Sequence, residues 1–90
     1  MKQVTSDQVR HFANKTIVEP ARKRGQQQIT IRAGDVHIAM KLRDRMPLVC
    51  SALQAMKFQT SSRLRLLNQV GPHQGANRTL TFEIAALKPS

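Results

Sequence analysis

The residue types that most often carry out catalysis or bind metal ions are few in this chain. Histidine occurs at His11, His37 and His73, and the single cysteine is Cys50. These residues fall in different segments and do not follow the spacing of a zinc site, so we expect no metal ion and no cofactor. The lone thiol forms no disulfide framework, and it lies beside an apolar stripe, where a small buried cysteine is usual.

The acidic residues give no better basis for catalysis. The chain has 5 Asp plus Glu, and no two of them stand at a spacing that suggests a general acid and a general base. Asp7, Asp35 and Asp44 instead occupy cap positions of predicted helices, where a carboxylate satisfies backbone N–H groups. We therefore predict a protein without enzymatic activity.

The chemistry that the sequence favours is the binding of an anionic partner. Lys plus Arg number 15, which gives a formal net charge of +10. Such a surface attracts phosphate-rich partners, and nucleic acid is the first to consider. With no Trp, no Tyr and only 3 Phe, the chain lacks the stacking platforms that readers of single strands use, so a duplex is the better match.

The length and apolar content indicate one small domain. Ninety residues with 40% apolar side chains can bury a single core, so we assign residues 1–90 to one domain with frayed ends at 1–4 and 88–90. No segment approaches the roughly 20 apolar residues of a membrane span, and the N-terminus lacks the apolar run of a signal peptide. Together with the lone thiol, this predicts a cytoplasmic protein with no membrane partner, associated with the nucleoid if it binds DNA.

Apolar spacing predicts a first helix from Thr5 to Gly25. Thr5 and Gln8 form a capping-box pattern. Its apolar stripe is Val9, Phe12, Ala13 and Ile17. Pro20 lacks an N–H and disfavours helical dihedrals at Glu19, so we expect a kink or restart near 18–20.

A short strand and a second helix are predicted next. Residues 28–32 alternate Ile29 and Ile31 with polar side chains, which is the period of a strand with one face on the core. Gly34 and Asp35 then provide a turn and an N-cap for a helix. The apolar positions expected in that helix are Val36, Ile38, Ala39 and Leu42, with Met40 near its end.

A third helix and a hairpin complete the pattern. The helix is expected to be capped by Asp44, to hold Pro47 in its first turn and to run to about Lys57. Its core stripe is Val49, Ala52, Leu53 and Met56. Residues 63–87 then predict two strands, joined by a loop over 71–77 that is too long for a two-residue hairpin turn.

This order of elements is that of a winged helix-turn-helix domain, and residues 35–53 (DVHIAMKLRDRMPLVCSAL) resemble the core of that superfamily. Ala39 matches the small residue at which the two helices approach, and Val49 and Leu53 match the positions that pack back. Residues 31–53 also resemble small stand-alone modules of bacteria and archaea. The resemblance implies an α+β fold with three helices, a short strand after the first helix and a C-terminal β-hairpin wing. One departure is a turn between Met40 and Val49 that is about two residues longer than the tight version.

The resemblance also implies a way of binding double-stranded DNA. The third helix would reach the major groove, while flanking cations and the wing would contact phosphates. Ser51 and Gln54 are then the candidate base readers, with the amide of Gln54 suited to adenine. The candidate phosphate contacts are Lys41, Arg43, Arg45, Lys57, Arg63 and Arg65, with Gln74, Asn77 and Arg78 in the wing.

Other interpretations stay open beside this one. The run 22–24 of three cations also suits a helix C-terminus, and Arg63 and Arg65 also suit protection of an edge strand. The function that we expect is that of a small transcriptional regulator or an accessory factor of a mobile or defence element. The alternatives are docking onto an acidic protein partner and binding of structured RNA by shape. A homodimer formed through the first helix or through residues 85–89 is compatible with the sequence.

Overall fold

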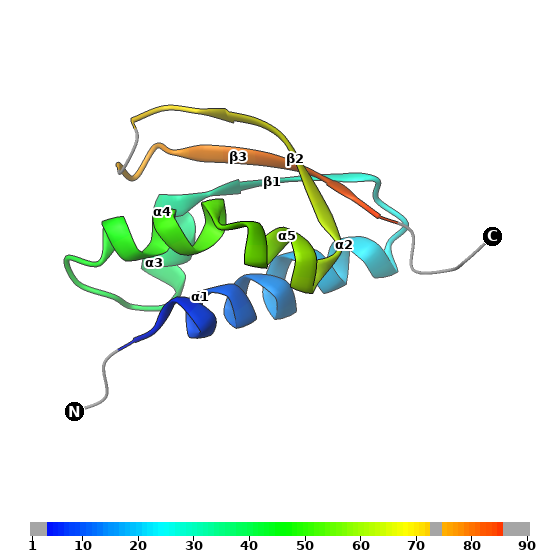
Figure 1. Cartoon of the computed structure of the whole chain (residues 1–90). Coiled ribbons are helices and arrows are strands. Elements are labelled where there is room, and N and C mark those ends of the chain that lie inside the picture. Colours follow the sequence, from blue (N-terminus) through cyan, green and yellow to red (C-terminus); the bar gives the residue numbers. More distant parts are fainter. Residues whose placement is uncertain (1–3, 73–74, 86–90) are drawn as a thin grey trace.

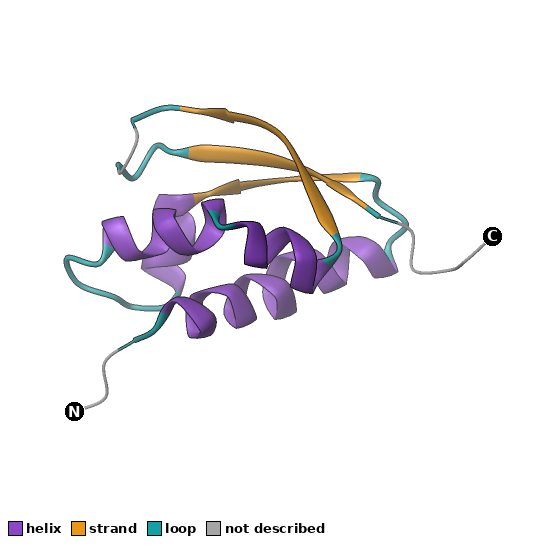
Figure 2. Cartoon of the chain, viewed as in Figure 1, coloured by secondary structure: helices purple, strands orange, loops and turns teal. Residues whose placement is uncertain are grey.

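The computed structural model describes residues 4–72 and 75–85, which form an α+β domain (Figure 1). In chain order the elements are α1 (Ser6–Ala13), the π-helical segment η1 (Asn14–Val18), α2 (Glu19–Lys23), β1 (Gln28–Arg32), α3 (Ala33–Ala39), α4 (Met46–Gln54), α5 (Met56–Ser62), β2 (Leu64–Val70) and β3 (Thr79–Ile84). The helices pack on one face of the sheet and leave its other face uncovered by any described helix (Figure 2). The predicted α+β class is therefore confirmed.

In the described ranges, three strands form one antiparallel sheet in the order β1-β3-β2. The predicted strand over 28–32 is confirmed, and its inward residue Ile31 pairs with Leu80 of the central strand. On the other side Leu66 pairs with Phe82, and a register shift between Leu66 and Asn68 forms a bulge in β2. In β1 and β3 the buried residues alternate with more exposed polar residues, as the period of two predicts, whereas residues 67–70 of β2 are all exposed.

The first helix is continuous from α1 through η1 to α2. The predicted capping box is confirmed: Gln8 N–H donates to Thr5 Oγ1 at 3.2 Å, and Thr5 N–H donates to Gln8 Oε1 at 2.9 Å. The predicted effect of Pro20 on Glu19 is wrong, because Glu19 keeps helical dihedrals of φ −62° and ψ −45°. The helix is irregular in the π-helical segment that ends at Val18, and regular α-helix restarts at Glu19, within the predicted range 18–20. The wider π turn accommodates the proline ring and its missing N–H.

The π-helical segment also changes which residues face the core. Val9 and Ala13 are fully buried, as predicted, but the next fully buried residue is Val18. Ile17, which was expected in the stripe, is only partly buried. A π turn takes up more residues than an α turn, so the buried stripe moves on by one position.

Helix α3 begins three residues earlier than predicted, and Asp35 is not its N-cap. The N-cap residue is Arg32, which supplies no side-chain cap. Instead, the N–H groups of Ala33 and Gly34 donate to main-chain carbonyls of Arg78 at 2.8 Å and of Ala76 at 2.9 Å. Because the loop before β3 satisfies these donors, a side-chain cap is not needed.

Two side chains assigned to the core side of this helix are exposed. Ile38 is 71% exposed, and Ala39, expected at the close approach of two helices, is also exposed. Helix α3 ends at Ala39 and is only about two turns long. One face of these two turns packs against the core, and Val36 is buried on that face.

The predicted third helix is two helices. Pro47 lies in the first turn of α4 as expected, but the N-cap residue is Arg45 and not Asp44. Asp44 has a left-handed φ of 51°, which places it in the linker instead. Helix α4 ends at Gln54, where Ala55 is extended at φ −69° and ψ 142°, and α5 starts at Met56.

The break at Ala55 reassigns one core position. Met56, expected in the buried stripe, is 70% exposed, whereas Phe58 is fully buried. The ring of Phe58 packs edge-to-face on Phe82 of the central strand, with ring centroids 5.4 Å apart. The core thus lies between helices and sheet, and burying a large side chain such as Phe58 stabilises the fold by about 1.5–3 kcal/mol. Cys50 is also fully buried, as predicted.

Candidate nucleic-acid interface

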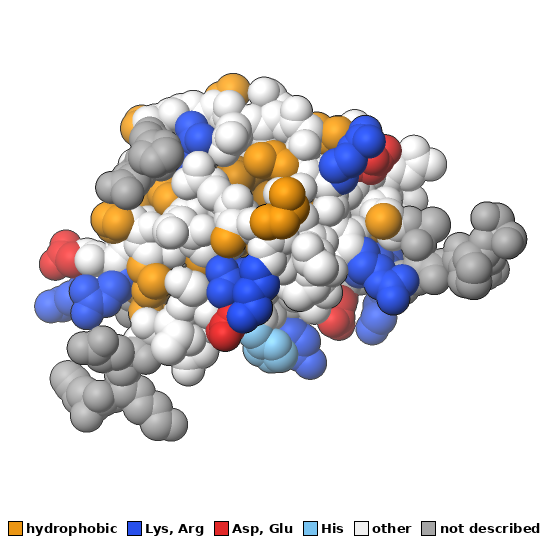
Figure 3. All heavy atoms as spheres, viewed as in Figure 1, with side chains coloured by type: hydrophobic (Ala, Val, Ile, Leu, Met, Phe, Trp, Pro, Cys, Tyr) orange, Lys and Arg blue, Asp and Glu red, His pale blue; other side chains and the backbone are white. Residues whose placement is uncertain are grey.

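The linker between α3 and α4, residues 40–45, carries three of the predicted phosphate contacts. Lys41, Arg43 and Arg45 are all exposed, and none forms an ion pair with a residue in the described ranges. The linker projects at one end of the molecule (Figure 1), and Figure 3 shows Lys and Arg side chains at that end. These three cations form a local positive surface, which we name the linker cations.

Two features give the linker a defined path. Lys41 and Asp44 adopt left-handed φ values of 58° and 51°, which reverse the chain direction locally. The backbone N–H of Arg45 donates to Nε2 of His37 on α3 at 3.2 Å. No local pattern in the sequence predicts this positioning role of His37, because the contact forms only when the fold brings α3 and the linker together.

The linker cations lead directly into the N-terminus of α4. No side chain caps this helix, and the positive end of its dipole adds to the charge of the cations that precede it. Ser51 is exposed one turn beyond Pro47, so it lies on the outward side of the same helix. The segment 41–51 thus carries the linker cations, the N-terminus of α4 and the exposed hydroxyl of Ser51.

The side chains of Gln54 and Arg78 are engaged with the protein. Gln54 Nε2 donates to the carbonyl of Cys50 at 3.0 Å, and Gln54 Oε1 accepts from Arg78 Nη2 at 3.1 Å. Arg78 also donates to Gln69 Oε1 at 2.6 Å and to the carbonyl of Gly71 at 3.1 Å. These contacts hold the hairpin against α4 and occupy part of the hydrogen-bonding capacity of both side chains.

The loop between β2 and β3 is held against the start of α3. Arg32 donates from Nη2 to Asn77 Oδ1 at 2.8 Å and from Nη1 to Asp35 Oδ1 at 2.8 Å. Asn77 is exposed, and its Nδ2 makes no hydrogen bond to a described residue. Gln74 and His73 lie outside the described residues.

The remaining predicted cations are distributed elsewhere. Lys57 pairs with Asp7 at 3.0 Å, and Arg65 pairs with Glu83 at 3.3 Å. Arg63 is exposed at the junction of α5 and β2, toward the opposite end of the molecule from the linker (Figure 1). Of the predicted cations, the structure thus gathers the linker cations alone at the start of α4.

Comparison with known proteins returned no matching family model, no matching curated protein and no matching solved structure. Within residues 4–72 and 75–85, no group of three or more His, Cys, Asp or Glu side chains could hold a metal ion. None of the described helices has the length and apolar character needed to cross a membrane.

Proposed function

We propose that this domain binds double-stranded DNA, with the linker cations and the N-terminus of α4 as its phosphate-binding surface. The observation that carries the proposal is the placement of Lys41, Arg43 and Arg45 directly before an uncapped helix. Backbone N–H groups, the helix dipole and flanking guanidinium groups all favour an anion at this position. The domain acts as a binding module without catalytic activity.

The order of elements supports a winged helix-turn-helix interpretation. Helices α3 and α4 stand in sequence between β1 and a β2–β3 hairpin, and the strand order is β1-β3-β2. In such a domain the second helix of the pair enters the major groove, and the hairpin lies along the backbone or minor groove. Ser51 is then the best-placed base reader, and Asn77 is a backbone contact from the hairpin loop.

The salt dependence of binding tests the phosphate surface. Three to five neutralised phosphates predict that log K falls with log salt at a slope of about −2.7 to −4.5. A labelled duplex of random sequence, titrated by fluorescence anisotropy at several salt concentrations, measures this slope. No duplex binding at the lowest salt would contradict the proposal.

A matched pair of double variants tests the location. Arg43→Gln with Arg45→Gln should reduce the magnitude of the slope by about 1.8 and weaken binding to all sequences alike. Arg24→Gln with Arg65→Gln removes the same charge from exposed positions at the end of α2 and in β2, outside the linker, and should leave the slope unchanged. An equal loss in both variants would mean that only net charge attracts DNA.

Sequence discrimination is tested separately from affinity. Selection from a random duplex library reveals any preferred site, and Ser51→Ala should reduce preference at one base pair. Gln54→Ala, the other predicted reader, should reduce preference only if DNA binding releases Gln54 from Arg78. A consensus would support the role of a transcriptional regulator or of an accessory factor of a mobile or defence element, and a palindromic consensus would indicate a dimer.

One observation favours a second candidate, docking onto a protein. Leu67 and Val70 on edge strand β2 are 42% and 52% exposed, and exposed apolar side chains on an edge strand suit strand addition by a partner. A pull-down from nuclease-treated extract would retain such a partner and lose nucleic acid. Preference for an A-form over a B-form duplex in competition would instead indicate structured RNA.

A further inference from the structure

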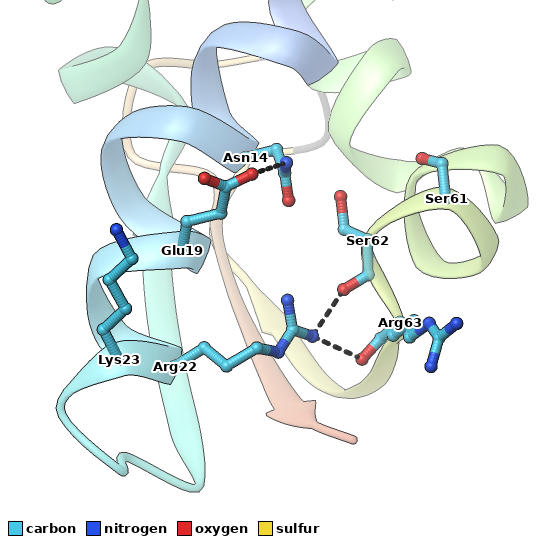
Figure 4. Close-up of a pocket in the computed structure, with 7 residues that line it drawn as sticks. All are labelled: Asn14, Glu19, Arg22, Lys23, Ser61, Ser62 and Arg63. Atoms are coloured by element: carbon cyan, nitrogen blue, oxygen red, sulfur yellow. Dashed lines mark hydrogen bonds between the residues drawn. The ribbon is translucent and has the colours of Figure 1, made fainter. Parts of the chain in front are cut away.

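A pocket of about 490 Å³, lined by polar and charged residues, lies between the first helix and the junction of α5 with β2 (Figure 4). It lies away from the linker cations, and its lining comes from η1, α2, α5 and the residue before β2. This volume falls in the range of sites for small ligands. The pocket is separate from the surface proposed to bind DNA, and the chemistry of its side chains indicates which ligand it would hold.

The pocket carries an excess of positive charge. Arg22, Lys23 and Arg63 line it, against a single carboxylate from Glu19. That carboxylate already accepts a hydrogen bond from Asn14 Nδ2 at 2.9 Å. The lining therefore has a net charge of +2 and favours an anionic ligand.

Arg22 is held in place with part of its guanidinium unused. Its Nη2 donates to the main-chain carbonyls of Ser62 at 2.7 Å and of Arg63 at 3.3 Å, at the C-terminal end of α5. Its Nε is buried and has no hydrogen-bond partner among the described residues, and its Nη1 likewise makes no hydrogen bond to a described residue. Figure 4 shows the guanidinium beside the main-chain carbonyls of Ser62 and Arg63, with its other terminal nitrogen directed toward the space between Asn14 and Ser62.

The polar groups around Arg22 suit a tetrahedral oxyanion. Ser61 and Ser62 contribute hydroxyls to the lining, and Lys23 contributes a mobile ammonium group. No aromatic side chain lines the pocket, so nothing there would stack on a nucleobase. In addition, the π-helical segment η1 begins at Asn14 in the pocket wall, and π turns are frequent at functional sites.

We propose that this pocket binds the phosphate group of a phosphorylated ligand. Nη1 of Arg22 and Nζ of Lys23 supply charged donors, the serine hydroxyls supply neutral donors, and Arg63 adds a third positive charge at the rim. The phosphate comes either from a small phosphorylated molecule or from a nucleic-acid backbone, and the same chemistry recognises both.

Phosphate binding to the pocket is tested by adding inorganic phosphate to the protein in a buffer that contains none and recording the chemical shifts of the backbone amides. We expect saturable shifts at Arg22, Lys23, Ser61 and Ser62. The double variant Lys23→Gln, Arg63→Gln should weaken binding by about tenfold. Both substituted side chains are exposed, so the α5 cap formed by Arg22 is retained.

A control with the same charge change keeps the test specific. Lys15→Gln with Arg24→Gln removes two exposed cations outside this pocket and should bind phosphate within twofold of the unmodified protein. Equal weakening in the two double variants, or non-saturating shifts spread over all cationic residues, would overturn the proposal.

A second titration, with duplex DNA, distinguishes a nucleic-acid backbone from a small phosphorylated molecule as the ligand of the pocket. Shifts at the pocket amides that compete with inorganic phosphate would identify a nucleic-acid backbone, and shifts confined to 40–51 would identify a small phosphorylated molecule. The variant Arg43→Gln, Arg45→Gln should bind inorganic phosphate normally. Failure of DNA binding therefore leaves the phosphate titration as an independent measurement.

Discussion

Nη2 of Arg78, in the loop before β3, donates to Oε1 of Gln54 on α4 at 3.1 Å, joining the hairpin to the helix that we propose contacts DNA. The same guanidinium reaches Gln69 on β2 and the carbonyl of Gly71. One half-buried side chain thus connects a helix, a strand and a loop. The hairpin is oriented relative to α4 through this side chain.

Replacing Arg78 should destabilise the fold. Arg78→Gln removes charge-assisted hydrogen bonds to three groups, and we expect the free energy of unfolding to fall by about 2 kcal/mol. Urea denaturation measures it, and exposed Arg24→Gln should change it by less than about 0.5 kcal/mol. The same small change at both positions would mean that the Arg78 contacts contribute no stability.

The two glycines with positive φ should differ in their tolerance of alanine. Gly71 has φ +95°, and a Cβ there would collide with the backbone of Asn77; Gly25 has φ +76° and nothing within 4 Å of an added Cβ. Gly25→Ala should cost about 1 kcal/mol from backbone strain alone, and Gly71→Ala at least about 2 kcal/mol. The urea midpoints of the two variants test whether Gly71→Ala is the more destabilising substitution. A lower midpoint for Gly25→Ala would contradict the predicted collision at Gly71.

Acid should remove the stabilisation contributed by Asp7. The hydrogen bond from Arg10, and then that from Lys57, lowers the pKa of the Asp7 carboxyl below 3.8. The charged form therefore stabilises the fold at pH values above the ordinary pKa of the carboxyl, and this contribution is lost as the pH falls through the lower folded-state pKa. Asp7→Asn should have a lower free energy of unfolding than the unmodified protein near neutral pH. This difference in free energy should shrink as the pH falls through the folded-state pKa of Asp7.

Urea denaturation of both proteins between about pH 2 and pH 6 follows this difference. Asp44→Asn is the control, because Asp44 forms no ion pair with a described residue. A difference between Asp7→Asn and the unmodified protein that stays constant down to pH 2 would contradict the assigned role of Asp7.

The thiol of Cys50 should be unreactive in the folded protein. Burial raises the pKa of Cys50, an effect that the nearby charge of Arg78 partly offsets, and Sγ donates to the carbonyl of Gly75 at 3.7 Å. Reaction with a disulfide reagent at pH 8 should be slower in buffer than in denaturing urea by about a hundredfold or more. Comparable rates would show that the loop over Cys50 opens readily.

Local patterns predicted the elements whose stability has local causes. Alternation at Ile29 and Ile31 predicted β1, and the capping box at Thr5 predicted the start of α1. The break at Ala55 carries no Gly or Pro signal, and apolar residues continue through it. It accompanies a packing contact between Phe58 and Phe82, residues far apart in the sequence.

The candidate site was predictable to a similar extent. Charge and polarity were enough to place the linker cations on the surface, because no apolar stripe includes them. The ion pairs of Lys57 with Asp7 and of Arg65 with Glu83 join separate elements, so the charge pattern of one helix or strand does not reveal them. Likewise, the pattern of its own helix placed Gln54 on the outward face, free to contact DNA. The contact with Arg78 forms only in the folded protein, where the hairpin brings Arg78 to α4.

The π-helical segment η1 makes the first helix tolerant to a change in chain length. In a regular helix Ala13 and Val18, five positions apart, would point about 140° away from each other, yet both are fully buried. The segment thus has the form of a one-residue insertion absorbed within a helix. Deleting one residue between Asn14 and Val18 would restore α geometry and keep Ala13 and the residues after the deletion on the same face, at the cost of setting Pro20 in a regular helix. Length variants of this domain should therefore accumulate in η1 more readily than in α4.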